Sequence, residues 1–183
     1  MSNVAAISRK STRRKYDQYY TPESATKTLL EHLNISGIVL EPCAGNKAIT
    51  SMLHAYGKKT ISTDIRENPE HDATRFSYWD EAKQHNISWV VTNPPYNAAT
   101  PILQYAFETA STGICFLLRL SYLEPCRDRG EWLSYHPPTK LIVLPRISFT
   151  NDGKTDSTTT AWFCWIKGCK EQEIIVIPKP VKI

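Results

Sequence analysis

Short apolar runs alternate with amphipathic segments along most of the chain. The runs at 37–43, 59–65, 88–93 and 113–120 are GIVLEPC, KTISTDI, SWVVTN and GICFLLRL. The first, third and fourth are brief and apolar, which is typical of buried strands, and the last is apolar enough to be covered on both faces of a sheet. The run 59–65 is more polar and is predicted to be the second strand. Between these runs, other segments carry apolar residues at helical spacing: 21–34, 46–57 and 100–111.

The three amphipathic segments also carry helix end signals. Thr21 is the expected N-cap of the first helix, with Pro22 in its first turn. Gly57 is expected to end the second helix, because glycine tolerates the left-handed backbone that follows many helices. Thr100 is the expected N-cap of the third. We therefore predict three helices, each placed between two strands.

The pattern changes in the last third of the chain. The apolar runs 140–146 and 158–168 are joined by the turn-rich segment 147–157 without a helix, which predicts an antiparallel hairpin at the sheet edge. The run 173–179 predicts one more strand, and 124–138 is interpreted as a loop with a short helix. The expected fold is α/β: a mostly parallel, doubly wound sheet with a C-terminal antiparallel hairpin.

The net charge of +4 is concentrated at the start of the chain. Five cations precede the first acid: Arg9, Lys10, Arg13, Arg14 and Lys15. This segment is polar and aperiodic, so we expect residues 1–16 to form a flexible basic arm and residues 17–183 a single domain. A basic arm suits a polyanion such as nucleic acid, which makes Arg13 and Arg14 candidate substrate-binding residues.

The five cysteines form no C-x-x-C pair. Three of them, Cys43, Cys115 and Cys164, lie in apolar strand-like runs. This favours reduced, packed thiols in a cytoplasmic protein over disulfides or a zinc site, and we expect no metal. No apolar run approaches the roughly 20 residues that a membrane helix needs, so no membrane contact is expected.

Candidate binding residues follow the predicted strands, because ligands of open α/β sheets bind beyond the carboxyl ends of the strands. The first strand ends in Glu41 and enters a small-residue turn with Ala44 and Gly45, which lets a ligand approach the backbone. An acid there suits a cationic or hydroxyl-bearing ligand better than a phosphate. The second strand ends in Asp64, where an acid commonly binds ribose hydroxyls. Asp72 follows and can accept from an exocyclic amine.

The strand at 88–93 runs into Asn93, Pro94, Pro95 and Tyr96. Proline lacks the backbone donor that would continue a strand, so two prolines fix the backbone at this carboxyl end. Proline is only about 5% of residues, and paired prolines after a buried strand are uncommon. We interpret the motif as part of a site. The alternative is a rigid turn with Tyr96 packed on the surface.

Together these motifs resemble the S-adenosylmethionine-dependent amino-methyltransferases that act on adenine N6, in the motif order of the gamma class. In that family a Tyr-x-Thr-Pro-like element precedes the glycine turn, as YYTPES does at 19–24, and Asn/Asp-Pro-Pro-Tyr/Phe follows, as NPPY does at 93–96. The resemblance runs from about Tyr19 to Lys167 and is carried by QYYTP, EPCAGN and NPPY. It implies a Rossmann-like methyltransferase fold, S-adenosylmethionine as cofactor and DNA as partner.

The resemblance also implies a cofactor site. Its expected members are Tyr19, Tyr20, Thr21, Glu41, Ala44, Gly45, Asp64, Asp72, Ala73 and Asn93. The first three would border the methionine end of the cofactor. Asp64 would bind the ribose, and Asp72 or Ala73 would lie near the adenine ring.

The chain departs from the family pattern in two places. The second glycine of the family's turn is replaced by Lys47. Because lysine prefers negative φ, we expect a changed turn or a reduced cofactor affinity. Only a few residues separate Asp64 from Asp72, too few for the usual intervening helix, so the family's next strand must be short or irregular.

The resemblance gives Asn-Pro-Pro-Tyr a chemical role. The lone pair of an aromatic amine is delocalised into its ring and is a poor nucleophile. The Asn93 side-chain oxygen and the Pro94 carbonyl would each accept one N–H, drawing the nitrogen toward sp³ and aiming its lone pair at the sulfonium methyl. Tyr96 would stack on the base, and Phe149 is either the opposite wall or an ordinary loop aromatic. The base must leave its helix, so base flipping or a single strand is implied.

Other functions remain open at this point. Asn-Pro-Pro-Tyr also occurs in methyltransferases of a release-factor glutamine amide, which usually carry an N-terminal helical domain for which this chain has no room, and in some RNA enzymes. A different class is a binding subunit with a methyltransferase fold that has lost catalysis, with Lys47 as the lesion. Intact Asn93 to Tyr96 argue against it. We expect no separate target-recognition domain, so target choice would come from loops, the arm or a partner subunit.

Overall fold

The computed structural model describes residues 21–147 and 158–179, and the expected basic arm at 1–16 lies outside them. The elements are, in chain order, α1 (Glu23–His32), β1 (Ile38–Glu41), α2 (Ala48–Ala55), β2 (Lys59–Ser62), α3 (Phe76–Lys83), β3 (Trp89–Thr92), α4 (Ala99–Thr109), β4 (Gly113–Arg119), the 3₁₀ helix η1 (Leu120–Leu123), α5 (Arg127–Tyr135), β5 (Lys140–Val143), β6 (Thr160–Ile166) and β7 (Glu173–Val176).

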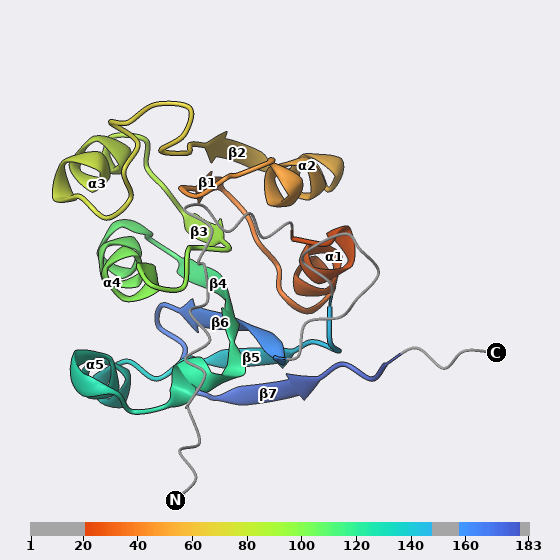
Figure 1. Ribbon diagram of the computed structural model, residues 1–183. Coiled ribbons are helices and arrows are strands. Elements are labelled where there is room, and N and C mark those ends of the chain that lie inside the picture. The colour runs from red at the N-terminus through yellow and green to blue at the C-terminus, as the bar shows by residue number, and fades with distance from the viewer. Residues whose placement is uncertain (1–20, 148–157, 180–183) are drawn as a thin grey trace, which may run out of the picture.

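The described strands form one sheet in the order β2-β1-β3-β4-β6-β5-β7 (Figure 1). Strands β2, β1, β3 and β4 pair in parallel. Strand β6 runs antiparallel to both of its neighbours, β4 and β5, and β7 pairs in parallel with β5. The predicted α/β fold and antiparallel hairpin are therefore confirmed. The hairpin lies beside the edge, which the additional strand β7 forms.

Helices cover both faces of the sheet, which makes it doubly wound (Figure 1). Successive strand residues alternate between two cores because side chains alternate across a sheet. In β1, Val39 packs with residues of α1 and α2, whereas Leu40 packs with residues of α3 and α4. Strand β3 divides in the same way, with Val91 on the first side and Val90 on the second. Parallel strands buried on both faces read as continuous apolar runs, which is why the sequence located them.

Two predicted helix caps are wrong. The N-cap position of α1 is held by Pro22 rather than Thr21, and that of α4 by Ala98 rather than Thr100, and neither helix has a side-chain cap hydrogen bond. Thr100 lies in the first turn of α4, where its hydroxyl shares a hydrogen bond of 3.0 Å with that of Tyr122. The Thr21 hydroxyl accepts a hydrogen bond from the Asn93 side chain. Both threonine hydroxyls therefore bond side chains that are distant in sequence, and neither caps its helix.

The segment between β2 and α3 contains turns and no strand, whereas the short spacing between Asp64 and Asp72 predicts a short or irregular strand there. The strand β2 is consequently an edge of the sheet. All five cysteines are free thiols, and Cys115 and Cys164 lie buried opposite one another on β4 and β6. Among the described residues, no helix is long and apolar enough to cross a membrane.

Candidate active site

The carboxyl ends of β1 and β2 are joined by hydrogen bonds that continue beyond the strands. The Thr63 amide donates to the Glu41 carbonyl at 2.9 Å, and the Ala44 amide donates to the Thr63 carbonyl at 3.0 Å. The Gly45 amide then donates to the Asp64 carboxylate at 2.7 Å. The sheet therefore brings the predicted glycine turn and the predicted ribose acid together.

Glu41 is almost fully buried at the end of β1, with 1% of its surface exposed. Its Oε2 accepts hydrogen bonds from the Thr50 amide, at 2.9 Å, and from the Thr50 hydroxyl, and so closes the first turn of α2. Burial raises the pKa of Glu41 to about 7 although the Thr50 hydrogen bonds act in the opposite direction. Glu41 is therefore a carboxyl group that titrates near neutrality, at the point where a ligand would approach the turn.

Asp64 ties the turn to the loop after β2. Besides the Gly45 contact, its carboxylate accepts from the Arg66 amide at 2.9 Å and from the Arg66 Nε at 2.7 Å. Burial acts to raise the pKa of Asp64, but the hydrogen bonds from Arg66 and Gly45 outweigh it, so the pKa lies below its usual value. Arg66 Nη2 adds a fourth hydrogen bond at 3.1 Å, so the about four acceptor positions of the carboxylate are filled, and a ribose hydroxyl would have to displace one of the Arg66 contacts.

Lys47 adopts a left-handed backbone with φ of 63° at the N-cap of α2. Gly45, two residues earlier, has φ of 56°. The turn thus keeps the positive φ that a glycine would supply, in place of the negative φ that lysine prefers. The Lys47 ammonium lies 2.9 Å from the Glu67 carboxylate, so it reaches across to the loop after β2.

Asp72 and Ala73 lie in the turn before α3. One carboxylate oxygen of Asp72 accepts from the Thr74 amide at 3.0 Å and the other lies 3.1 Å from the Arg75 Nε, so both oxygens are already engaged. Burial raises the pKa of the neighbouring Cys43 thiol to about 12, and the charges of Asp64, Glu41 and Asp72 add to the rise.

Asn93 follows β3, and its side chain is half-buried. Its Nδ2 donates to the Thr21 hydroxyl at 3.1 Å, which links the entry of α1 to the end of β3. The helix α1 is itself fixed to β6, because the Trp162 indole donates to the Ala25 carbonyl at 2.8 Å. With Nδ2 turned to Thr21, the Asn93 Oδ1 is directed away from it and accepts no hydrogen bond from a described residue.

The two prolines form the turn between β3 and α4. Pro94 is buried and Pro95 is exposed. The Pro95 carbonyl accepts from the Ala98 amide at 2.9 Å, which closes the turn, whereas the Pro94 carbonyl accepts from no described residue. The loop therefore leaves two acceptors at the end of β3, the Asn93 Oδ1 and the Pro94 carbonyl.

Tyr96 is half-buried and packs against the core under α4. The guanidinium carbon of Arg119, the last residue of β4, lies 4.7 Å from the centre of the Tyr96 ring. Arg119 had no role in the sequence prediction. The available signal was a single cation at the end of an otherwise apolar strand.

Some predicted site residues lie outside the described part of the chain. They are Arg13, Arg14, Tyr19, Tyr20 and Phe149. The structure brings together Thr21 with Asn93, and Glu41 with Ala44, Gly45 and Asp64. Among the described residues, no group of His, Cys, Asp or Glu could hold a metal ion.

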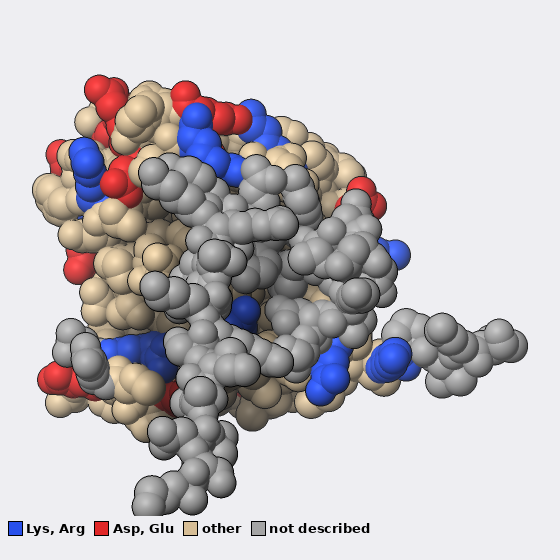
Figure 2. Space-filling view, viewed as in Figure 1, with Lys and Arg blue, Asp and Glu red and all other residues tan. Residues whose placement is uncertain are grey.

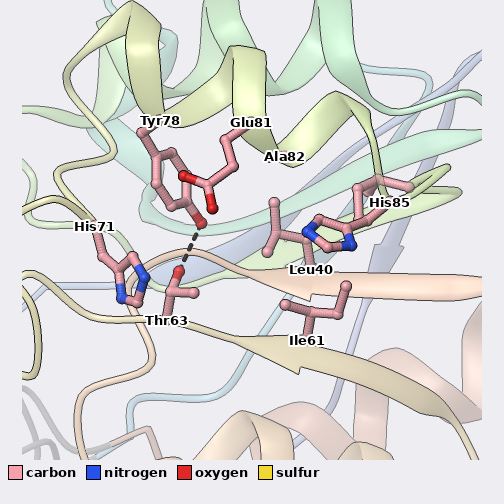
Figure 3. A pocket seen from close by; sticks show the side chains of 9 residues that line it. Leu40, Ile61, Thr63, His71, Tyr78, Glu81, Ala82 and His85 are labelled. Carbon is pink, nitrogen blue, oxygen red and sulfur yellow. Dashed lines mark hydrogen bonds between the residues drawn. The ribbon is translucent and has the colours of Figure 1, made fainter.

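A cavity of about 200 Å³ lies between α3 and the strands β1 and β2 (Figure 3). The Thr63 and Tyr78 hydroxyls share a hydrogen bond of 2.6 Å across one end of it. Its lining residues are Leu40, Ile61, Thr63, His71, Tyr78, Glu81, Ala82, His85 and Ile87. None of the sequence-predicted site residues lines this cavity, but its lining residue Thr63 is hydrogen-bonded through its backbone to Glu41 and Ala44 of the strand-end site.

The described surface mixes charges of both signs. Figure 2 shows Lys and Arg side chains interspersed with Asp and Glu side chains over the upper elements α2, β2 and α3. This part of the surface therefore carries no continuous basic patch of the kind that binds a polyanion without further help.

No family model and no curated protein matches the chain. Among solved structures, it is similar to a protein from Listeria monocytogenes assigned to the class I S-adenosylmethionine-dependent methyltransferases, with a TM-score of 0.57 at 11% identity over 90% of this chain and 67% of that one. It is also similar to the methyltransferase subunit of a type I restriction-modification system from Streptococcus thermophilus, with a TM-score of 0.58 at 12% identity over 87% and 47%.

A third similar structure is the M protein of the type I restriction enzyme EcoKI, with a TM-score of 0.59 at 14% identity over 84% of this chain and 44% of that one. The chain spans about two thirds of the Listeria protein and less than half of the other two. Similarity at these identities establishes the fold: this is a Rossmann-like methyltransferase fold, as the motif order predicts.

Proposed function

We propose that this protein transfers a methyl group from S-adenosylmethionine to the exocyclic N6 amine of adenine in DNA. The observation that carries the proposal is the pair of acceptors at the end of β3, the Asn93 Oδ1 and the Pro94 carbonyl. An aromatic amine has two hydrogens to donate, so two acceptors on consecutive residues, neither of them bonded by a described donor, match it. The prolines hold these acceptors in place before a substrate arrives.

The ends of β1 and β2 fit the proposed cofactor. Its amino-acid end carries an ammonium group and its sulfur a positive charge, which suit the carboxylates of Glu41 and Asp64. Ala44 is buried and the Arg66 guanidinium lies beside Gly45, so in this proposal the cofactor approaches the turn by displacing Arg66. When bound, S-adenosylmethionine supplies a methyl group on an electrophilic sulfonium. The roles of Tyr19 and Tyr20 at its methionine end, and of Asp72 or Ala73 near its adenine, rest on the resemblance alone.

In this proposal each residue of the motif has one task. The Asn93 Oδ1 and the Pro94 carbonyl accept the two N–H groups of the target amine, which makes its lone pair available. The N–C bond forms as the S–C bond breaks, and the nitrogen then releases one proton to water. The Tyr96 ring stacks on the base that has left its helix, with Phe149 as the proposed opposite wall.

DNA is the proposed partner for two reasons. Two of the similar structures are methyltransferase components of restriction enzymes by their names. The sequence also places Arg13 and Arg14 in a basic segment before the domain, which suits contacts with phosphates. A partner subunit for target recognition belongs to the same proposal, because the Streptococcus protein is one subunit of a type I restriction-modification system.

The test is methyl transfer from labelled cofactor to unmethylated DNA, followed by digestion to nucleosides. The Asn93→Ala variant should lose about 10²–10³-fold in rate, by analogy with removal of one preorganised oxyanion-hole donor, and should keep its cofactor affinity in calorimetry. Asn97→Ala, which removes an exposed amide one residue beyond the motif, is the matched control. Tyr96→Ala should weaken capture of the base by about 1–3 kcal/mol, and Tyr96→Phe should cost less because the ring face remains.

The product decides between the alternatives. N6-methyladenine in DNA supports the proposal, whereas N4-methylcytosine alone would move the protein to the neighbouring substrate class. Methylation of adenine in RNA but not in DNA would show that the substrate is RNA. Nucleic-acid binding without any methyl transfer would identify a catalytically weakened subunit, and wild-type turnover by Asn93→Ala would refute the mechanism.

A further inference from the structure

We propose that Arg119 is a positioning residue for this reaction, which holds the Tyr96 ring from one face so that the target base stacks on the other. The inference rests on the proposed function, because it concerns the stacking step. No sequence motif assigns a role to Arg119. The proposal comes from its place in the sheet and its contact with Tyr96.

The sheet places Arg119 beside the motif. Strand β4 lies next to β3 in parallel, and Phe116 is the partner of Thr92, the last residue of β3. Arg119 is three residues beyond Phe116, so it lies level with Pro95, which is three residues beyond Thr92. On its other side, Arg119 pairs with Thr160 at the start of β6. Its backbone is thus held by β6 on one side and faces the turn after β3 on the other, so its side chain starts from a paired strand residue beside the motif.

The contact with Tyr96 is a cation–π contact. The guanidinium carbon lies 4.7 Å from the ring centre, within the range of a cation–π contact. The Arg119 Nε and the Tyr96 hydroxyl are both enclosed by protein. The guanidinium therefore lies over one face of the Tyr96 ring, and in this proposal the base stacks on the opposite face.

This arrangement explains how Tyr96 would serve the two acceptors. A base stacked on a ring that tilts or rotates would carry its amine away from the Asn93 Oδ1 and the Pro94 carbonyl. A planar guanidinium over the ring restrains that motion better than a lysine ammonium, which is a point charge. Arg119 therefore acts through Tyr96 and is a positioning residue rather than a catalytic one.

A phosphate contact is the competing role for a cation here. It predicts weaker DNA binding with a smaller salt dependence, by about 0.9 in the slope of log K against log salt on duplex DNA, and an unchanged kcat. The positioning role predicts the opposite division: kcat falls and the salt slope stays the same. The two roles are therefore separable in one set of kinetic measurements.

The experiment compares Arg119→Met and Arg119→Lys with Arg129→Met. Arg129 is the matched control, because its guanidinium carbon lies 4.8 Å from the ring of Tyr122, outside the motif. With saturating cofactor and DNA, we expect Arg119→Met to lower kcat by about tenfold to hundredfold, the cost of misplacing reacting groups by about 1 Å. The kcat of Arg119→Lys should lie between those of Arg119→Met and the wild type, and the kcat of Arg129→Met should equal that of the wild type. Cofactor affinity should not change in any variant.

A second readout follows the ring itself. In fluorotyrosine-labelled protein, the Tyr96 ¹⁹F NMR resonance is identified by its loss in Tyr96→Phe. It should shift in both Arg119 variants and stay unchanged in Arg129→Met, where the Tyr122 resonance should move instead. Equal urea midpoints for Arg119→Lys and wild type would exclude misfolding as the cause of a lower kcat.

The outcomes are distinct. An unchanged Tyr96 resonance, a wild-type kcat in Arg119→Met, or a reduced salt slope with normal kcat would each overturn the role of Arg119 while leaving the proposed function standing. A wild-type protein that methylates no nucleic acid would refute the proposed function, and with it the catalytic part of this inference. A lower kcat with a shifted Tyr96 resonance and an unchanged salt slope supports it.

Discussion

Replacing Glu41 with glutamine should make the free protein more stable above neutral pH and should weaken its binding of S-adenosylmethionine. The carboxyl group is 1% exposed, and burial raises its pKa from 4.5 to about 7. The ionised form is therefore disfavoured in the folded state relative to the unfolded chain. Between these two pH values the folded state binds more protons, so stability falls as pH rises.

The size of the effect follows from the pKa. The difference between 4.5 and about 7 corresponds to about 3 kcal/mol, at about 1.4 kcal/mol for each pH unit. The neutral Glu41 carboxyl gives the wild-type protein this contribution in full below pH 4.5, and the contribution is lost above pH 7. Glutamine stays neutral, and its amide oxygen can still accept from the Thr50 amide and hydroxyl. The variant should be about 1–3 kcal/mol more stable than wild type at pH 8, since its own amide hydrogens also need partners.

The assay is urea unfolding of both proteins at several pH values between 4 and 8. The stability difference should grow from near zero at pH 4.5 to its full size above pH 7. Glu31→Gln is the control. Glu31 is exposed on α1 and forms an ion pair with Lys27 one turn earlier, and its loss should change the free energy of unfolding by no more than about 0.5 kcal/mol at any pH. A Glu41→Gln protein less stable than wild type at pH 8 would show that the carboxylate stabilises the fold, contrary to this reasoning.

The same substitution tests the cofactor role of Glu41. An ammonium group prefers the ionised carboxyl, so binding to wild type must release a proton below pH 7, and affinity should fall by up to about tenfold for each pH unit below that value. Calorimetry should find this pH dependence absent in Glu41→Gln and its affinity lower at pH 8. Identical affinity profiles in the two proteins would remove Glu41 from the cofactor site.

Three further predictions concern the neighbouring groups. Lys47→Gly should be about 1 kcal/mol more stable than Lys47→Ala in urea unfolding, because a left-handed φ costs a residue with a side chain about 1–2 kcal/mol; equal stability would contradict the strain. Thr21→Val removes the acceptor of the Asn93 amide and should lower kcat by about tenfold, whereas Thr21→Ser should restore it, and a wild-type rate for Thr21→Val would exclude a positioning role. Asp64→Ala should weaken cofactor binding by about tenfold to hundredfold in calorimetry, and unchanged affinity would refute the ribose contact.

The sequence predicts the sheet well because buried parallel strands are visible as apolar runs. Strands β1 to β4 appear in the expected order, and the antiparallel hairpin of β5 and β6 follows from the missing helix between them. The helix α3 has no comparable signal. It is eight residues long, begins at an exposed Phe76 and has no side-chain cap, so neither periodicity nor an end signal marks it.

The candidate site is predicted less completely, because its contacts join residues far apart in sequence. Local rules assign the Thr21 hydroxyl to a helix cap, but in the structure it accepts from Asn93. A preference for negative φ predicts a changed turn at Lys47, yet the backbone there keeps a positive φ. Arg119 ends an apolar strand, and only the register of β3 and β4 brings it to Tyr96.

Two costs to stability lie in the same turn, and this supports a functional role for it. Glu41 holds a buried carboxyl group whose pKa is raised to about 7, and Lys47 holds a left-handed φ that a glycine would adopt without strain. A structural turn would gain stability from glutamine at the first position and glycine at the second. Strain and buried charge of this kind persist where they serve binding or catalysis. A cationic ligand at this turn would offset the first cost by stabilising the ionised carboxyl, so the stability gained on cofactor binding should be larger in wild type than in Glu41→Gln.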